Sequence, residues 1–547
     1  MKFTTVLAAA LCATVIFLFP AGSQVVDTKI PGDPVAIDSG HLAGKVLPSG
    51  VKAYLGVPFA AAPVRELRWK EPQPAKAWKG VYNADRKMPE CIQVLRPHNI
   101  NHYFGEEASS EDCLYMNIWT PATAKAGANL PVIVFIYGGG GTIGSSGMAN
   151  YDGEQVAKRG AIFVNFNYRV GILGFMAHPE LTKEQGGHSG NYGYLDQNAA
   201  LKWIKRNIAK FGGDPTKVVI SGQSAGAGSV VQQTFSPLSK GLFRGAIMWS
   251  GCNWASDNTP LATAEKTGLD IQKALKANNL DDMRQVPADR ILAVQSESQL
   301  GASVTGFRTG GVMDGYFAPK KKADILAAHE FNDVPIIASF THDEASIALK
   351  QAKAVAEYKA AAAKTFGDSA DEFLKLYPVS TDADILPMAQ TAANDASGLL
   401  NSCGCASMQA KYNKSQAYIM VFARKHPYVP GVKIADQDTA TVGAYHTSEM
   451  PYFLGTQDAY NMFRDTRNWT PWDRELSQKM TASIIAFART GNPATPDVKW
   501  PAWSATDQQY ISFGDKITVE KVNAARLEFM TKHRPPAGLG LPTGTRD

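Results

Sequence analysis

Short apolar runs alternate with longer stretches of helical periodicity through much of the chain. The runs are rich in Val, Ile, Phe and Tyr, and residues 197–211 carry apolar side chains at helical spacing. Unbroken apolar runs of this kind are typical of buried, mostly parallel strands joined by helices. The clearest predicted strands cover residues 131–137, 161–168, 218–221, 245–250, 334–340 and 417–423. The pattern therefore predicts an α/β protein built on a large, mostly parallel sheet.

Two helical stretches rich in Ala and Leu interrupt the strand pattern. They cover about residues 260–330 and 350–412. We expect them to be insertions that cover the sheet or its active site, although helices packed on an ordinary core would show the same pattern. The last segment, residues 535–547, is rich in Pro and Gly and is expected to be a loose tail.

The composition is that of an ordinary globular protein. Of 547 residues, 45% are apolar and 19% charged, with 55 Lys and Arg against 50 Asp and Glu. The net charge of +5 is not the basic footprint of a nucleic-acid-binding protein, and the cationic run at residues 320–322 is expected to face solvent. Nucleic acid is therefore excluded as the expected partner, while the length by itself favours two or more domains.

The N-terminus has the pattern of a secretory signal. Lys2 precedes an apolar run over residues 6–19, and small residues follow at positions 20–23. That run is shorter than the roughly 20 residues a spanning helix needs, and no other segment is long and apolar enough to cross a membrane. We therefore expect residues 1–23 to be removed and the protein to be secreted or periplasmic.

Export permits disulfides, and the chain has six cysteines. Because Cys12 lies in the expected signal, an odd number remains, so at least one thiol is free or paired between chains. Cys91 and Cys113 are the best candidates for a disulfide, since a bond between them would close a polar loop. No second Cys or His pair is placed to complete a tetrahedral metal site, and we expect no metal or other cofactor. The cysteines whose partners stay open are Cys252, Cys403 and Cys405.

A serine pentapeptide follows one of the predicted strands. Residues 222–226 read G-Q-S-A-G, directly after the strand at 218–221, and a helix-forming stretch runs over residues 225–234. The pentapeptide alone is a weak signal, but a strand, a sharp turn and a helix are the setting that lifts a nucleophilic serine above a sheet. The pattern therefore predicts Ser224 as a nucleophile, with a solvated serine in a Gly-rich turn as the alternative.

Four consecutive glycines, residues 138–141, follow the strand at 131–137. Attack on an ester carbonyl creates an oxyanion that needs preorganised N–H donors, and glycines let backbone amides approach a substrate freely. A phosphate-binding loop is the rival interpretation, but the segment lacks both the Gly-Lys-Ser/Thr ending and the G-x-G-x-x-G helix start. The oxyanion donors are therefore predicted at Gly139, Gly140 and Ala225.

Several longer motifs occur in a fixed order along the chain. They are Y-L-G-V-P-F-A at 54–60, S-E-D-C-L-Y-M-N-I at 110–118, N-Y-R-V-G at 167–171, G-N-Y-G at 190–193 and F-G-G-D-P at 211–215. Together with the serine pentapeptide, they resemble the type B carboxylesterase/lipase family, the esterase and cholinesterase-like branch of the α/β-hydrolase fold. The resemblance implies a large, mostly parallel sheet with helices on both faces and helical insertions over the active site.

The resemblance also implies a catalytic triad. A serine hydroxyl needs a histidine to accept its proton, and the histidine needs a carboxylate to orient it, but composition does not choose among ten histidines. Residues 443–449 resemble the family segment that carries the catalytic histidine, and residues 341–345 resemble the D-E-G segment that carries the acid. His446 and Glu344 are thereby implied, in the chain order of α/β-hydrolases. Asp343 remains the rival acid.

Departures from the family concern the substrate. Gln223 stands where cholinesterases have Glu, and the loop between Cys91 and Cys113 has no Trp to bind a quaternary ammonium. No marked preference for choline esters is therefore expected. Gly141 replaces a bulky aromatic residue, which would widen the acyl side of the pocket. The remaining pocket or supporting positions implied by the resemblance are Ser250, Trp254 and Glu449. For Trp254, an ordinary core position is equally expected. For Glu449, the alternative is a glutamate on the surface.

These expectations together describe a secreted serine carboxylesterase that hydrolyses neutral carboxylic esters through an acyl-enzyme on Ser224. Because one sheet must gather residues from 139 to 446, residues 24–534 are predicted to form a single catalytic domain with insertions. A lipase acting on longer-chain acylglycerols is the alternative. A non-catalytic cholinesterase-like interaction domain is disfavoured, since all three triad residues are present. The expected partner is a small neutral ester, and the sequence predicts no oligomeric state.

Overall fold

The computed structural model describes residues 28–93, 108–299, 307, 309–434, 437–535 and 538–539. The expected signal, residues 1–23, lies outside the described residues, as do residues 94–107 of the loop between Cys91 and Cys113. Most of the expected tail also lies outside them. Within the tail, the short strand β20 (Gly538–Leu539) pairs with β16 (Ala345–Ser346).

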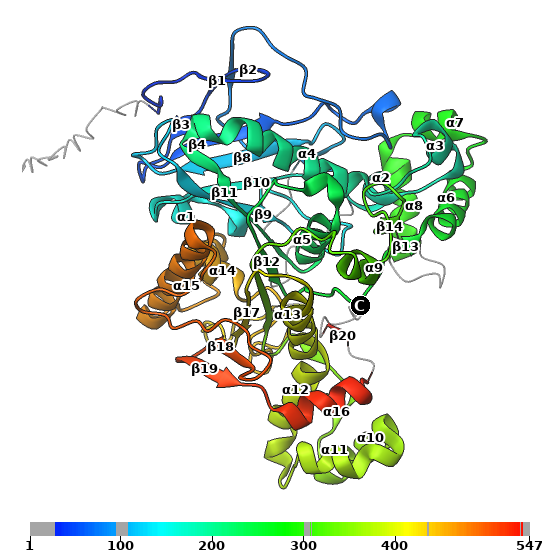
Figure 1. The fold of residues 1–547 in the computed structure, drawn as a ribbon, viewed down its shortest axis with the longest axis vertical. Coiled ribbons are helices and arrows are strands. Elements are labelled where there is room, and N and C mark those ends of the chain that lie inside the picture. The colour runs from blue at the N-terminus through cyan, green and yellow to red at the C-terminus, as the bar shows by residue number, and fades with distance from the viewer. Residues whose placement is uncertain are drawn as a thin grey trace, which may run out of the picture.

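An eleven-stranded sheet, counted over the described residues, forms the centre of the molecule (Figure 1). Its order is β19-β18-β17-β15-β12-β11-β9-β10-β8-β4-β3. The strands from β18 to β10 pair in parallel, and the strands beyond them at both edges pair antiparallel. The strands are β3 (Lys45–Val46), β4 (Lys52–Pro58), β8 (Tyr115–Thr120), β9 (Leu130–Ile136), β10 (Ile162–Phe166), β11 (Gly213–Gln223), β12 (Gly245–Trp249), β15 (Ile336–Thr341), β17 (Ala417–Phe422), β18 (Gln509–Phe513) and β19 (Ile517–Lys521).

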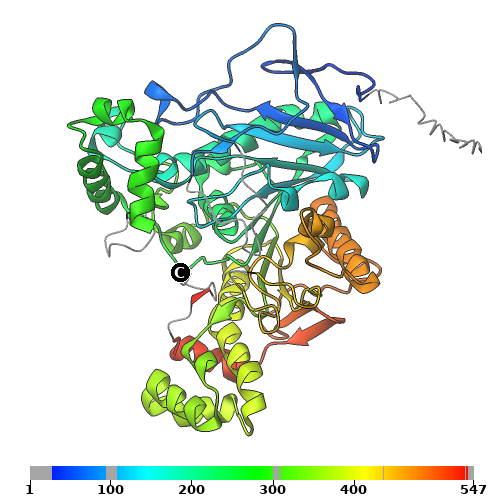
Figure 2. The same cartoon turned by 180° about the vertical axis from the view of Figure 1, so that it is seen from behind.

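Six of these strands, β9, β10, β11, β12, β15 and β17, are those predicted from the apolar runs, and the predicted mostly parallel sheet is confirmed. Their residues are almost all buried because helices cover both faces (Figures 1 and 2). A strand enclosed on both sides needs an unbroken apolar run rather than alternating apolar and polar residues. This is why these strands could be predicted from the sequence.

Two of the helices around the sheet were expected from the sequence, over residues 197–211 and 225–234, and both are present. Those on one face include α4 and α5, and those on the other include α1 and α15 (Figures 1 and 2). The predicted helix over residues 197–211 starts earlier, at Tyr192, and its last turn is a 3-10 helix that ends at Phe211. These helices are α1 (Glu154–Lys158), α2 (Gly171–Phe175), α3 (Pro179–Glu184), α4 (Tyr192–Asn207), α5 (Ala225–Phe235), α14 (Met450–Leu454), α15 (Pro471–Thr490) and α16 (Ala524–Lys532).

The two expected insertions are helical and bury small cores of their own. The first packs around Trp69, Ile271 and Phe317. The second packs around Tyr358 and Phe373, together with residues of α16, and the two lie at different ends of the molecule (Figure 1). Their helices are α6 (Leu261–Leu275), α7 (Leu280–Gln285), α8 (Ala288–Gln299), α9 (Lys322–Ala327), α10 (Val355–Phe366), α11 (Ala370–Leu376), α12 (Ile385–Asn394) and α13 (Leu400–Tyr412).

The expectation that the cationic run 320–322 faces solvent is wrong for Lys322. Only 5% of its surface is exposed, and its ammonium donates a hydrogen bond to the carbonyl of Ser256 near the ring of Phe235. Burial lowers the pKa of Lys322. A long aliphatic stem allowed this lysine to cross an apolar layer and reach a backbone acceptor.

Loops that carry the predicted site residues meet at one edge of the sheet. The glycine run follows β9, the serine pentapeptide begins in the last two residues of β11, and the 341–345 segment begins at the last residue of β15. Carboxyl ends of parallel strands lie at the same edge, where α/β proteins form their binding sites. The sheet therefore brings together segments that are far apart in the sequence.

Candidate active site

Ser224 lies in a sharp turn between strand β11 and helix α5. The strand ends at Gln223 and the helix begins at Ala225, so the whole change of direction falls on Ser224, at φ 58° and ψ −124°. Residues other than glycine rarely adopt such angles, which cost about 1–3 kcal/mol and persist only where the surroundings impose them. The Ser224 N–H donates to the carbonyl of Trp249 on the neighbouring strand at 2.8 Å.

The glycines that flank the serine are required by close backbone contacts. A Cβ at Gly222 would lie 2.3 Å from the carbonyl oxygen of Gly226, and a Cβ at Gly226 would lie 2.1 Å from that of Ile136. Backbone atoms cannot move aside as the end of a long side chain can. The G-x-S-x-G spacing is therefore a packing requirement of this turn.

The glycine run lies against the same turn. Gly139, Gly140 and Gly141 have φ values of 106°, 67° and 72°, and a Cβ at Gly138 would lie 2.4 Å from the carbonyl oxygen of Gln223. In the described part of the chain, no hydrogen bond is found for the N–H groups of Gly139, Gly140 and Ala225. Ala225 opens helix α5, where the first N–H groups have no partner within the helix.

His446 and Glu344 are hydrogen-bonded and buried. The Nδ1 atom of His446 lies 2.6 Å from Oε2 of Glu344, and each residue is 6% exposed. The same carboxylate oxygen accepts a hydrogen bond from the hydroxyl of Thr341 at 3.0 Å. Because the carboxylate accepts, Nδ1 of the neutral ring carries the proton and Nε2 keeps its lone pair.

Asp343, the rival acid, contacts the backbone beside His446. Its Oδ2 atom accepts a hydrogen bond from the N–H of Ala444 at 2.6 Å, and its own N–H donates to the carbonyl of Ala444 at 2.9 Å. Burial acts to raise the pKa of Asp343, but hydrogen bonds from His342 and Ala444 bring it below its ordinary value. Of the two neighbouring acids, Glu344 is the one bonded to the His446 ring.

Gln223 links the histidine to the serine turn. Its side-chain amide nitrogen lies 3.3 Å from Nε2 of His446, and the residue is 1% exposed. The amide can only donate through nitrogen, so Nε2 accepts. The lone pair of His446 is thus directed towards the residue next to Ser224.

Glu449 is a buried carboxyl group close to this network. It is 1% exposed, and its carboxyl oxygens have no hydrogen-bond partner among the described residues. Burial raises the pKa of Glu449 well above its ordinary value, and the charge of Glu344 raises it further. The protonated form of Glu449 is therefore favoured over the charged form, and its environment is the buried one of the two that the sequence allowed.

The remaining predicted pocket residues lie in different surroundings. A Cβ at Gly141 would meet only the ring of Phe175, at 3.9 Å, so Gly141 borders open space. Ser250 has a φ of 51°, and its N–H donates to the carbonyl of Ser339. Trp254 is 2% exposed. Its ring centroid lies 5.4 Å from that of Phe235 and 4.8 Å from that of Phe331, which are the contacts of a core residue.

Comparison with known proteins finds carboxylesterases that match most of the chain. The carboxylesterase family model matches residues 32–530. A fumonisin B1 esterase of Sphingopyxis macrogoltabida is 34% identical over 507 residues, which cover 91% of this chain and 89% of that one. A para-nitrobenzyl esterase of Bacillus subtilis (strain 168) is 30% identical over 479 residues, 86% of this chain and 93% of that one.

The chain belongs to the carboxylesterase family. The solved structure of a PNB esterase has a TM-score of 0.73 and 28% identity, and the match covers 92% of this chain and 99% of that one. The α/β-hydrolase fold and the family predicted from the sequence motifs are thereby confirmed. The protein is a carboxylic ester hydrolase.

Two disulfides are formed among the described residues of this carboxylesterase. Cys91 bonds to Cys113, and Cys252 bonds to Cys405 across 153 residues of sequence. Cys403 is a buried free thiol, and burial raises its pKa to about 12. The second disulfide was left open by the sequence, because nothing local relates the loop after β12 to helix α13.

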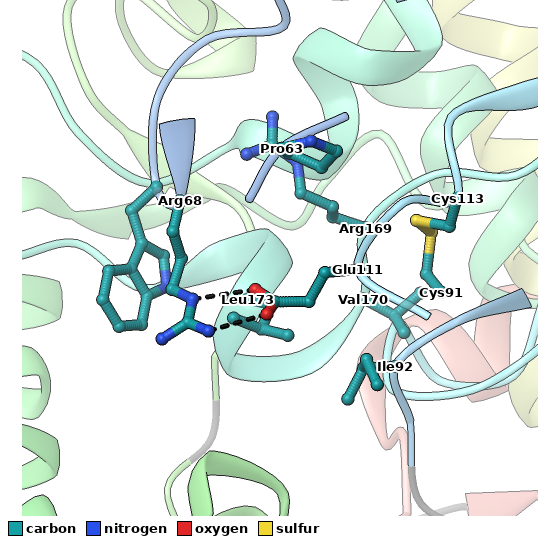
Figure 3. Close-up of a pocket in the computed structure, with 10 residues that line it drawn as sticks. Pro63, Arg68, Cys91, Ile92, Glu111, Cys113, Arg169, Val170 and Leu173 are labelled. Carbon is teal, nitrogen blue, oxygen red and sulfur yellow. Dashed lines mark hydrogen bonds and ion pairs between the residues drawn. A yellow bond between two sulfur atoms is a disulfide. The ribbon is translucent and has the colours of Figure 1, made fainter. Parts of the chain in front are cut away.

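A small cavity lies beside the first disulfide (Figure 3). Its volume of about 10 Å³ is roughly that needed for one water molecule. Arg68 and Glu111 form a paired hydrogen bond in its wall at 2.8 and 2.7 Å, and Arg169 also lines it. None of Ser224, Glu344 and His446 is among its lining residues, so this cavity is not the candidate active site.

The described ranges contain neither a candidate membrane span nor a candidate metal site. There, none of the helices combines the length and apolar composition needed to cross a bilayer. The same residues contain no group of three or more His, Cys, Asp or Glu side chains placed to hold a metal ion.

His426 lies close to the site but was not predicted from the sequence. It lies under the loop that carries His446 and contacts the carbonyl of Ser448. Most histidines other than His446 were expected in loops or at helix ends, and His426 does follow a strand. No local pattern distinguishes a buried histidine in a loop from a solvated one.

Proposed function

We propose that this carboxylesterase hydrolyses neutral carboxylic esters through an acyl-enzyme on Ser224. The observation that carries the proposal is the position of His446, whose Nδ1 is bonded to Glu344 at 2.6 Å and whose Nε2 is directed to the serine turn. A histidine bonded to a carboxylate through Nδ1 can accept the serine proton at Nε2, while the carboxylate stabilises the resulting imidazolium.

In the first half of the reaction, Nε2 of His446 takes the hydroxyl proton as the Ser224 oxygen attacks the ester carbonyl. The negative charge that develops on the carbonyl oxygen is stabilised by the N–H groups of Gly139, Gly140 and Ala225. When the tetrahedral intermediate collapses, the bond to the alcohol oxygen breaks and His446 returns the proton to the alcohol. The products are a free alcohol and an acyl group bound to Ser224.

The second half repeats these steps with water. His446 removes a proton from water, the hydroxide attacks the acyl carbonyl, and the same N–H groups stabilise the charge. Collapse of the second intermediate breaks the bond to Ser224, which recovers its proton from His446. The carboxylic acid leaves and the enzyme returns to its starting state.

The expected substrates are uncharged at the alcohol side. Gln223 is neutral where a cholinesterase has Glu, and Gly141 borders open space that an aromatic side chain would fill. Both features favour a wide, uncharged pocket over one that selects a quaternary ammonium. A choline ester is therefore expected to be no better a substrate than a neutral ester of equal acyl length.

We also propose that residues 24–534 form one catalytic domain that is exported after loss of residues 1–23. The two disulfides support an oxidising compartment. Mass spectrometry of the protein recovered from the periplasm or the medium is expected to find a chain that begins near Gln24. A cytosolic chain that still begins at Met1 would contradict export.

The serine mechanism is tested by Ser224→Ala. Because the substitution removes one oxygen from a turn that stays intact, the variant is expected to fold with an unchanged circular dichroism spectrum. Its turnover of a 4-nitrophenyl ester is expected to fall by at least about 10⁴-fold, and an organophosphate is expected to label the wild type only. A variant that keeps most of the turnover would refute the assignment. A screen of acyl length that includes an emulsified long-chain triglyceride separates esterase from lipase.

A further inference from the structure

The loop that carries His446 contains a strained residue. Thr447 has a φ of 81°, in the left-handed region that β-branched residues almost never adopt. Such a conformation costs about 1–3 kcal/mol and persists only when surrounding contacts impose it. The contacts that hold this loop therefore matter for the orientation of its histidine.

Two side chains hold the loop on either side of His446. On the N-terminal side, Asp343 forms hydrogen bonds with both the N–H and the carbonyl of Ala444. On the C-terminal side, Nε2 of His426 lies 2.8 Å from the carbonyl oxygen of Ser448. The strained Thr447 and the catalytic candidate His446 both lie between these two attachments.

The hydrogen bonds of His426 define its protonation. A carbonyl oxygen only accepts, so Nε2 must carry a proton to bond to Ser448. The guanidinium Nε of Arg467 only donates, and it lies 3.3 Å from Nδ1 of His426, so Nδ1 must be unprotonated. The hydroxyl of Tyr445 also lies 3.1 Å from Nδ1. His426 is therefore neutral, with its single ring proton directed at Ser448.

Burial keeps the ring in that state and in that place. His426 is 4% exposed, and burial lowers its pKa well below the ordinary value, as does the charge of Arg467. The rings of Tyr445, Trp469 and Tyr460 surround it edge to face at 5.0, 5.0 and 5.7 Å. The imidazole is thus enclosed by a cage of aromatic rings, while its hydrogen bonds to Ser448, Tyr445 and Arg467 fix its orientation.

We infer that His426 is a positioning residue for catalysis, which donates its Nε2 proton to the Ser448 carbonyl and so holds His446 in the orientation that faces the serine turn. It does not exchange protons with the substrate, because its ring nitrogens are occupied by Ser448, Tyr445 and Arg467. The inference rests on the proposed role of His446 as the base that activates Ser224.

The test compares two replacements of His426 that differ in one hydrogen-bond donor. His426→Gln keeps an amide N–H near the position of Nε2, whereas His426→Leu fills the cage without a donor. With a soluble 4-nitrophenyl ester, we expect kcat of the Leu variant to fall about tenfold with KM changed less than about twofold. The rate of organophosphate labelling of Ser224 is expected to fall in parallel, and the Gln variant is expected to keep at least a third of the wild-type kcat.

Trp469→Phe is the matched control. It loosens the same cage but leaves the hydrogen bonds of His426 in place, so it is expected to lower the unfolding temperature without lowering kcat. If the Leu variant does not fold, His426→Asn replaces it, because its shorter amide lies near Nδ1 and does not reach Ser448.

The outcomes separate the two proposals. Loss of kcat in the donor-free variant together with rescue by Gln supports the positioning role. Wild-type kcat in the folded Leu or Asn variant overturns it, and so does an equal loss in the Gln and Trp469→Phe variants, which would show a general effect of destabilisation. Failure of the proposed function would appear elsewhere, as undiminished turnover in Ser224→Ala and His446→Gln.

Discussion

The serine turn and the histidine loop lie at the same edge of the sheet but are held in different ways. Residues 222–226 are fixed at both ends by regular structure, and backbone atoms pass so close to the two glycines that no side chain fits. Residues 443–449 have neither a strand nor a helix within them. Side chains from elsewhere in the sequence, Asp343 and His426, attach the loop to the sheet.

The difference shows that two parts of one candidate site can depend on different features of the chain. The serine turn depends on the absence of side chains at Gly222 and Gly226. The histidine loop depends on the presence of hydrogen-bonding groups at Asp343 and His426. Substitutions are therefore expected to act differently: even a methyl group should damage the serine turn, whereas an isosteric replacement that keeps the bond should preserve the histidine loop.

Apart from Ser224→Ala, the largest effect is expected from Glu344→Gln. The amide can donate to Nδ1 of His446, which would favour the tautomer with its proton on Nε2 and leave no base for Ser224. We expect kcat to fall about 10³ to 10⁴-fold, measured with a 4-nitrophenyl ester, while the unfolding temperature changes little. A larger loss in Asp343→Asn than in Glu344→Gln would show that the acid has been assigned to the wrong residue.

Gly226→Ala is expected to have the next largest effect. Its new Cβ would lie 2.1 Å from the carbonyl oxygen of Ile136, so the serine turn must shift and Ser224 moves from its position. We expect kcat/KM to fall about 100-fold, together with a lower unfolding temperature. Gly228→Ala is the control, because a Cβ there has no atom within 4 Å and a helical alanine is stabilising. Equal effects of the two substitutions would show that the close contact at Gly226 is not the cause of the loss.

A smaller effect is expected at Asp343. Asp343→Ala removes the acceptor of the Ala444 N–H, so kcat is expected to fall about tenfold as the histidine loop loosens. Asp343→Asn keeps a carbonyl oxygen for that N–H, so its kcat is expected to stay within about threefold of the wild type. The kcat values of the two variants, measured by steady-state kinetics, test this expectation. A strong loss in the Asn variant would mean that the negative charge, rather than the hydrogen bond, holds the loop.

The smallest effect on activity, and a clear effect on stability, is expected from Glu449→Gln. Burial raises the pKa of Glu449 in the folded protein, so above the unfolded value of about 4.3 the folded state binds the extra proton. Stability contributed by this group therefore falls as pH rises, with a slope of at most about 1.4 kcal/mol per pH unit. The free energy of unfolding of the Gln variant should lack this decrease with rising pH.

Urea unfolding of both proteins at pH 5 and pH 8 tests this linkage. The free energy of unfolding of Glu449→Gln relative to the wild type is expected to be higher at pH 8 than at pH 5. An unchanged difference between the two pH values would mean that Glu449 titrates normally and is not held neutral by its buried position.

The central strands and the serine turn could be predicted because their causes are local. A strand enclosed on both faces needs an unbroken apolar run. The apolar strand that leads directly into the G-x-S-x-G pentapeptide predicts the turn at Ser224. The position of Lys322 could not be predicted in this way. Its neighbours in sequence are exposed or half-buried lysines, and only the segment near Ser256, brought to it by folding, supplies the acceptor that allows its burial.

What the sequence by itself determined is therefore the six central strands, the turn that presents Ser224 and the glycine run beside it, because each depends on residues that are neighbours in the chain. The family motifs added His446 and Glu344, with Asp343 as the rival acid. Only the tertiary structure decided that Glu344 contacts the histidine ring while Asp343 contacts its backbone, that Cys252 reaches Cys405, and that His426 supports the loop. These contacts join segments tens to hundreds of residues apart, and no local pattern encodes which of them meet.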